Sequence, residues 1–151
     1  MSLKSTLVET SALEVLKLVL PVLFGFLLGY ITFTKQYDAN EKGRLNDNLN
    51  KILDINLDYP YIEDSAFIAR WSNGEVGDSD SASRYATYCE YVFNFIQNAC
   101  DYFGYDKKKV MTFVDMDELV RQHITWWNAP HEENSKSYPE DFRQFINSNY
   151  K

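Results

Sequence analysis

The sequence predicts an all-α protein, with an N-terminal transmembrane helix followed by a helical cytosolic domain of about five helices. Two observations support this fold class. The 17 residues from Leu18 to Thr34 carry no charge, which is typical of a membrane-spanning helix. After them, apolar residues recur three and four positions apart, and no segment alternates between apolar and polar residues as a half-buried strand does. The chain therefore contains an anchor and one helical domain.

The uncharged segment indicates a permanent membrane anchor with a span of about residues 15–34. A helix of 17 residues covers about 25 Å, the short end of what a hydrocarbon core requires. A buried helix of a soluble protein is one alternative, but such a helix normally keeps a polar stripe and this segment has none. A cleaved signal peptide is another, and Glu9 and Glu14 before the apolar run disfavour it.

Three residues inside the anchor are candidates for helix association and bending. Gly25 and Gly29 form a G-x-x-x-G pattern, which lets the backbones of two membrane helices approach closely. Pro21 removes one backbone donor near the start of the span and predicts a kink or hinge there. The alternative for the glycines is that this residue is simply common in membrane helices.

Charge sets the expected orientation and excludes one class of partner. We divide the chain into the anchor, residues 1–37, and the helical domain, residues 38–151. The charges of the first 34 residues cancel, so the formal net charge of −7 falls on the part of the chain that follows them. An acidic domain binds DNA poorly, so we expect no DNA partner. Lys35, Lys42 and Arg44 follow the span, whereas two lysines precede it. This small excess of positive charge predicts that the domain is cytoplasmic.

After the anchor, the periodic pattern predicts three helical regions in order. The first is an amphipathic helix over residues 39–57, which continues the anchor and ends before Pro60. A shorter helix is expected over 61–71, followed by a loop rich in Gly, Ser and Asp over 72–83. The strongest helical pattern covers 83–103 and is apolar on two faces, so this helix is expected to be buried on both.

The C-terminal helices are predicted from their end signals. Asp106 caps a helix that continues, after a break at Asp115, as far as Trp127. The sequence Asn-Ala-Pro at 128–130 ends that helix. The last helix is expected to begin with a capping box over residues 137–140.

The motifs of common catalytic and metal sites are absent from the sequence. There are two histidines, His123 and His131, and two cysteines, but none has the spacing of a zinc site. The sequence has no glycine-rich phosphate loop and no nucleophile elbow. We therefore expect no catalytic residues, no metal and no cofactor, and hence no enzyme.

The segment from Arg121 to Asn128 carries the kinds of side chain that an adenine nucleotide requires. Trp126 and Trp127 offer stacking faces, and the amide of Asn128 can pair with the edge of adenine. Arg121 supplies a cation for phosphate, and His123 lies on the same helix. These five residues are candidate ligand contacts. The alternative is that both tryptophans pack in the core and that His123 is a hydrogen-bonded residue at its boundary.

Three further cations are candidates for binding phosphate. Arg84 lies at the start of the long predicted helix, and Lys107 and Lys108 lie at the start of the next one. The helix dipole favours anions at both places. The alternative is that all three are exposed charges that keep the domain soluble.

The chain carries, in this order after the anchor, the segments LDYPYIED, RYATYCEYVFNFI, HITWW and YPEDFRQFI. This order resembles a group of small bacterial single-pass membrane proteins with a helical cytosolic domain. Within that group the chain is most similar to the small membrane effector of type III CRISPR systems. The resemblance implies a homotetramer in the bacterial inner membrane that binds cyclic tetra-adenylate. It also implies that the bound ligand perturbs the membrane or opens a pore in antiviral defence.

A protein-interaction module is the alternative function. The same features fit a membrane-tethered helical domain that docks a protein partner through its tyrosine-rich surface and binds no nucleotide.

Overall fold

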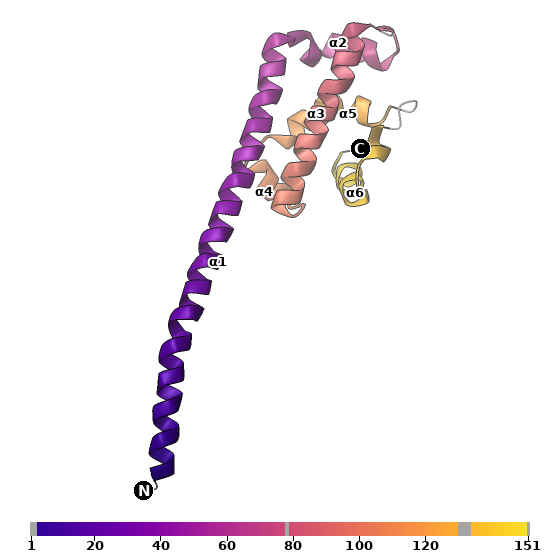
Figure 1. Cartoon of the computed structure of the whole chain (residues 1–151). Coiled ribbons are helices and arrows are strands. Elements are labelled where there is room, and N and C mark those ends of the chain that lie inside the picture. Colours follow the sequence, from indigo (N-terminus) through magenta and orange to yellow (C-terminus); the bar gives the residue numbers. More distant parts are fainter. Residues whose placement is uncertain (1–2, 78, 130–133, 151) are drawn as a thin grey trace. The chain divides into compact units, whose positions relative to one another are not determined.

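The all-α fold predicted from the sequence is confirmed. The structure, a computed structural model, describes residues 3–77, 79–129 and 134–150, with side chains from Glu14 onward. These residues form helices and turns and contain no strand. In chain order the helices are α1 (Leu3–Asp58), the 3₁₀ helix η1 (Pro60–Glu63), α2 (Ser65–Ser72), α3 (Asp80–Phe103), α4 (Lys107–Met111), α5 (Met116–Trp127), the 3₁₀ helix η2 (Asn134–Ser137) and α6 (Glu140–Asn149), as Figure 1 shows.

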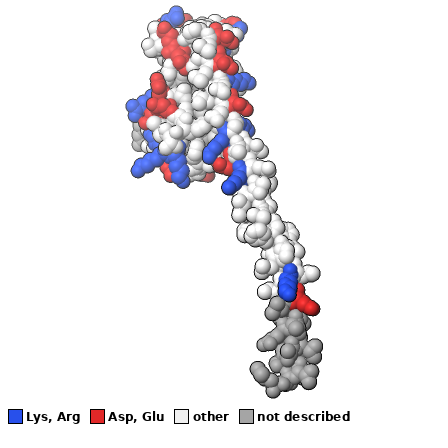
Figure 2. All heavy atoms as spheres, turned by 90° about the vertical axis from the view of Figure 1, so that its left-hand side faces the viewer, with Lys and Arg blue, Asp and Glu red and all other residues white. Residues whose placement is uncertain are grey.

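Helix α1 runs without a break through the predicted anchor and the amphipathic segment after it. Among the described residues it is the one helix long and apolar enough to cross a membrane. The large apolar side chains between residues 18 and 34 are exposed, and Figure 2 shows a stretch of α1 without charge on the visible face, with charged residues on either side of it. Lipid covers such a surface in a membrane protein. Pro21 lies inside α1, which continues through it.

The chain forms two compact units, Met1–Gly43 and Arg44–Lys151. The boundary therefore lies within α1, a few residues after the boundary expected at 37/38. Leu45 and Ile52, on the last turns of α1, are buried in the core of the second unit. Those turns belong to the helical domain because their apolar side chains pack there.

Helix α3 is central to the second unit, where it packs against α4 and α5. It buries residues on more than one face, as its two apolar stripes predict: Tyr85, Tyr88, Cys89, Val92, Phe93, Phe95, Ile96, Ala99 and Cys100. The two cysteines of α3 form no disulfide. Because α3 is buried on more than one face, the elements that pack on those faces are held in position around it.

The helix predicted over 61–71 is divided in two by Asp64. The Asp64 carboxylate accepts hydrogen bonds from the backbone N–H groups of Ala66 and Phe67, so it caps α2. The residues before it form the 3₁₀ helix η1, which begins at Pro60. The spacing of apolar residues does not show that one helix ends and another begins at Asp64, because this boundary depends on a hydrogen bond between the Asp64 side chain and the backbone.

Helix α3 begins earlier than the sequence predicts. The Ser79 hydroxyl accepts a hydrogen bond from the backbone N–H of Ala82, and the helix therefore starts at Asp80 and not at Ser83. The predicted loop is correspondingly shorter. The cap predicted at Asp106 is confirmed, since its carboxylate accepts backbone N–H bonds at the start of α4. At Asp115, where the sequence predicts a break, the carboxylate accepts a hydrogen bond from the backbone N–H of Glu118 and caps α5.

The capping box predicted at the start of the last helix does not form. The Ser137 hydroxyl donates instead to the carbonyl of Asn134, at 2.7 Å, and Glu140 pairs with Arg143 one turn later. Pro139 is the N-cap residue of α6, without a side-chain cap bond. Pro130 and His131 lie outside the described residues.

Candidate functional site

The nucleotide site predicted at the end of α5 is not an accessible surface in the structure. His123 is 0 % exposed, and Trp126 and Trp127 are each 1 % exposed. Phe93 of α3 stacks on both indoles, with ring centroids 5.4 Å from Trp126 and 4.8 Å from Trp127. Large aromatic rings gain most from leaving water, so these side chains form core. The prediction that they contact a ligand is corrected in favour of the packing alternative.

The exposed members of the predicted site do not gather around these rings. Arg121 is exposed on α5, Asn128 is exposed directly after it, and Lys108 is exposed on α4. The indoles of Trp126 and Trp127 are buried in the core, so they offer these polar side chains no exposed stacking surface of the kind that a base requires.

Lys107 joins three parts of the second unit. Its Nζ lies 2.8 Å from a carboxylate oxygen of Asp117 and 4.6 Å from the centre of the Tyr150 ring. The hydrogen bonds from Lys107 and then from Tyr150 lower the pKa of Asp117. Lys107 therefore links α4 to α5 and to the residue after α6, which is a structural role.

His123 is a buried, neutral imidazole. Its Nδ1 lies 3.1 Å from the hydroxyl of Tyr85, and the ring of Tyr88 meets it edge-on with centroids 5.3 Å apart. No hydrogen-bond partner for its Nε2 is present in the described part of the chain. Burial lowers the pKa of His123 to about 4. The folded domain thus holds this side chain uncharged at neutral pH.

The burial of His123 predicts a loss of stability on mild acidification. An unfolded histidine takes up a proton near pH 6.5, whereas the folded one does so only near pH 4. The unfolded state therefore binds more protons in this window, and the free energy of unfolding falls as the pH falls, by about 3 kcal/mol in total. Denaturant unfolding of the full chain in detergent, followed by tryptophan fluorescence at several pH values, measures this loss.

The control for this prediction is His123→Gln, which keeps a polar side chain but does not titrate in the window. Its unfolding free energy should change less between pH 6.5 and pH 4 than that of the unmodified chain. An equal pH dependence in both proteins would show that His123 is not the group responsible.

A groove in the second unit offers a different candidate site. It has a volume of about 270 Å³ and lies between the end of α1, η1 and the first half of α3. Its lining combines aromatic rings, hydroxyl groups, two aliphatic side chains and one guanidinium: Ile55, Tyr59, Ile62, Ser83, Arg84, Thr87, Tyr88 and Tyr91. This mixture of apolar surface with a few polar groups is typical of small-molecule sites.

Arg84 is the predicted cation that the structure places in a groove. Its Nε lies 2.9 Å from a carboxylate oxygen of Asp80, and its Nη1 donates to the Tyr59 hydroxyl at 2.8 Å. The guanidinium also lies 4.8 Å from the centre of the Tyr59 ring. The hydrogen bond with Asp80 raises the pKa of Arg84. Arg84 is thus a charged donor held beside an aromatic face.

A second cation lies next to another tyrosine of the groove. Lys51 Nζ donates to the Tyr91 hydroxyl at 3.2 Å and lies 4.6 Å from the centre of the same ring. Tyr91 is exposed. The groove therefore has a cation next to each of two accessible tyrosines, Arg84 by Tyr59 and Lys51 by Tyr91.

Hydrogen bonds fix the buried wall of the groove. The Tyr88 hydroxyl donates to the Glu63 carboxylate at 2.9 Å, and the side-chain amide of Asn56 donates to the same oxygen. Burial, and then the hydrogen bond with Glu63, raises the pKa of Tyr88. Tyr88 is therefore a neutral side chain that is held in a fixed position in the wall of the groove.

Another pocket of the second unit has the opposite electrostatic character. It has a volume of about 530 Å³ and carries two carboxylates, Glu63 and Glu118, with no basic residue in its lining. The remaining lining residues are Ser65, Ile68, Ala69, Ser72, Gln122 and Thr125. A phosphate would be repelled here, so the groove at Arg84 is the better candidate for an anion.

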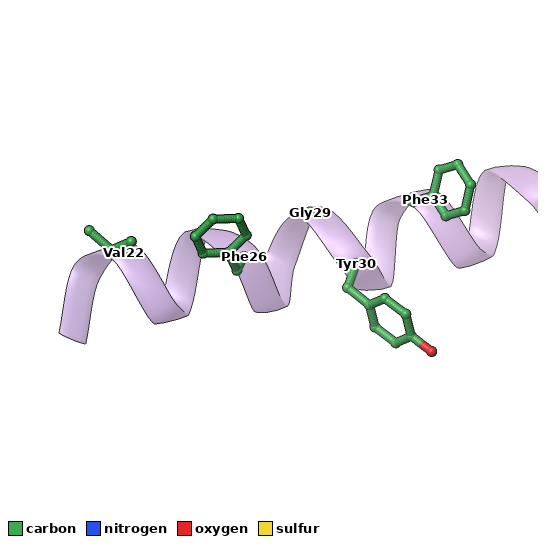
Figure 3. A pocket seen from close by; sticks show the side chains of 6 residues that line it. Val22, Phe26, Gly29, Tyr30 and Phe33 are labelled. Carbon is green, nitrogen blue, oxygen red and sulfur yellow. The ribbon is translucent and has the colours of Figure 1, made fainter. Parts of the chain in front are cut away.

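In the first unit, the two glycines of the anchor border an open apolar depression on the surface of α1. Figure 3 shows Gly29 among the larger side chains along this helix. Val22, Phe26, Tyr30 and Phe33 line the depression together with Gly25 and Gly29. A Cβ added at either glycine would meet no atom within 4 Å. No contact within the described part of the chain therefore requires glycine there, and both glycines lie on an open face.

Sequence reasoning missed the tyrosines of the groove and Lys51. A signal was present on α3, because Arg84, Thr87, Tyr88 and Tyr91 have the spacing of one helix face. Tyr59 was not identifiable in the same way, because it reaches the groove from the turn before Pro60, far away in the sequence.

Comparisons with protein-family models, with curated proteins and with solved structures give no match to this chain. The similarity to the type III CRISPR membrane effector thus stays a prediction from the sequence.

Proposed function

We propose that the chain is a membrane-anchored sensor whose helical domain binds cyclic tetra-adenylate as an oligomer. The ligand would enter the groove at Arg84, and the response would be a change at the membrane, by perturbation or by a pore, in antiviral CRISPR defence. The observation that supports this proposal is the guanidinium of Arg84 held against the ring of Tyr59, with Lys51 against Tyr91 nearby.

The chemistry of the groove suits one nucleotide. Tyrosine faces stack on bases regardless of sequence, and an arginine fork binds phosphate oxygens in pairs. The hydroxyl groups of Ser83 and Thr87 line the same groove and suit hydrogen bonds to a ribose. Asp80 holds Arg84 in the absence of ligand, so a phosphate would compete with this carboxylate.

The volume of the groove limits how much of the ligand one subunit holds. Sites for drug-sized ligands measure about 300–1,000 Å³, and this groove has about 270 Å³. It therefore accommodates a single base or nucleotide and not a whole cyclic tetranucleotide. Four copies around the ligand would each hold one equivalent unit, and their modest individual affinities would combine.

Helix α1 is the proposed route from the ligand to the membrane. Ile55 lines the groove and lies on α1, the helix that also carries the candidate membrane span. A ligand that packs better in one arrangement of the subunits than in another shifts the population toward the first. A change at Ile55 would then act on a helix that continues into the lipid.

Titration calorimetry of the full chain in detergent micelles tests the ligand. We expect saturable heat with cyclic tetra-adenylate, and linear tetra-adenylate and inorganic phosphate serve as comparison ligands. Arg84→Ala should weaken binding at least about tenfold, because it removes a charge-assisted hydrogen bond. Arg70→Ala is the matched control, since Arg70 is exposed on α2 and does not line the groove. Absence of heat with both oligoadenylates, or equal affinity of the Arg84→Ala protein, would overturn the proposal.

The alternative, a membrane-tethered protein-interaction module without a nucleotide ligand, is favoured by one observation. Leu53 and Leu57 are 50 % and 79 % exposed in the second unit, although each would gain by leaving water. In that case no oligoadenylate gives heat, and the two leucines mark the surface that a protein partner covers.

A further inference from the structure

The second unit leaves one face of α1 uncovered. Asn46, Asn50, Leu53 and Leu57 are exposed, whereas their sequence neighbours Leu45 and Ile52 are buried in the core. The exposed four are spaced by four, three and four residues, which is the a/d register of a coiled-coil heptad. We call these four residues, which lie on a different face from the one packed in the core, the α1 seam.

The same register continues toward the N-terminus of α1 without a charged residue. Its preceding positions are Gln36, Ala39 and Gly43, all exposed, and a Cβ added to Gly43 would meet no atom within 4 Å. Seven consecutive a and d positions are therefore occupied by small residues, by residues with an amide side chain, or by leucine. An ordinary solvent-facing helix surface carries charges, and the other faces of α1 beyond Thr34 do carry them.

The residues that flank the seam are complementary between identical chains. With Asn50 and Gly43 at position a, Lys42 is a g residue and Asp47 an e residue. In a parallel pair, g of one helix faces e of the next heptad in the other, so Lys42 of each copy meets Asp47 of its partner. Lys42 already pairs with Asp38 in its own helix at 3.0 Å, and Asp47 of the second copy would add to that interaction.

We propose that the occupant of the α1 seam is the same helix of a second copy of this chain, in parallel orientation. Leu53 and Leu57 supply the apolar contacts, and the pairs of Lys42 with Asp47 of the other copy fix the register and the parallel orientation. Two chains anchored in one membrane by α1 are already parallel. The seam needs no nucleotide, so it holds or fails independently of the proposed ligand.

Cysteine cross-linking of the full chain in membranes tests the seam. Asn50→Cys puts a thiol at an a position, where two parallel helices approach closely enough for a disulfide. Arg44→Cys is the matched control, because this residue is exposed one position after Gly43 and lies off the seam. The native Cys89 and Cys100 are buried, so the unmodified chain gives the background level of cross-linking. We expect disulfide-linked dimers on mild oxidation with Asn50→Cys at a yield several times that of Arg44→Cys.

A second variant separates specific pairing from chance collision. Leu53→Lys with Leu57→Lys, added to Asn50→Cys, should lower the cross-linked fraction several-fold while leaving the tryptophan fluorescence unchanged, since both leucines are exposed. Equal yields from Asn50→Cys and Arg44→Cys, no cross-link at Asn50→Cys, or no effect of the two lysines would each overturn the proposal.

Discussion

Replacing Leu23 and Leu27 by arginine is expected to release the chain from the membrane fraction. Both leucines lie near the middle of the candidate span, and both are exposed in the structure. Each arginine at the centre of a membrane helix costs about 2.5–3.5 kcal/mol on insertion scales, so the pair costs about 5–7 kcal/mol. Immunoblotting of membrane and soluble fractions after an alkaline wash measures the redistribution.

The matched control is Leu23→Val with Leu27→Val, which keeps the segment apolar and should leave the chain in the membrane. If the double-arginine chain stayed in the washed membranes in the same amount as the valine control, residues 15–34 would not be the anchor.

Trp127→Ala is expected to remove much of the stability of the helical domain. Its indole stacks on Phe93 with centroids 4.8 Å apart, meets Phe142 edge-on at 5.6 Å, and donates from Nε1 to Asn147 at 3.1 Å. Loss of a buried tryptophan costs about 3–5 kcal/mol, against a total of about 5–15 kcal/mol for a typical domain. Denaturant unfolding of the full chain in detergent, followed by the fluorescence of Trp71 and Trp126, measures this change.

Asn128→Ala is the control for the tryptophan variant. Asn128 is exposed beside Trp127, so its replacement should change the free energy of unfolding by no more than about 0.5 kcal/mol. If Trp127→Ala unfolded like Asn128→Ala but weakened nucleotide binding, Trp127 would be a ligand contact and its assignment to the core would be wrong.

Most helices were predictable because their signals are local. The cap at Asp106 and the break at Asp115 depend on residues close to each other in the chain, and the structure confirms them. The errors arose where two local signals compete. Ser137 and Glu140 have the spacing of a capping box, but each finds a nearer partner in its own turn, Asn134 and Arg143.

The candidate site was less predictable because it depends on contacts between distant segments. Periodicity placed Trp126 and Trp127 on helix faces, but only the position of Phe93, more than thirty residues earlier, shows that both faces are covered. The groove likewise needs Tyr59 from the turn and Tyr91 from α3. Arg84 was identified from its place at a helix start, but the aromatic surface beside it was not.

We propose that residues 15–34 cross the membrane and leave the helical domain on the cytoplasmic side. The most direct measurement uses the full chain with a C-terminal epitope, expressed in a bacterial host, with protease added to intact and to permeabilised spheroplasts. We predict that the chain sediments with membranes and that the epitope survives in intact spheroplasts but is lost on permeabilisation. Loss of the epitope in intact spheroplasts, or recovery of the chain in the soluble fraction without detergent, would contradict this account.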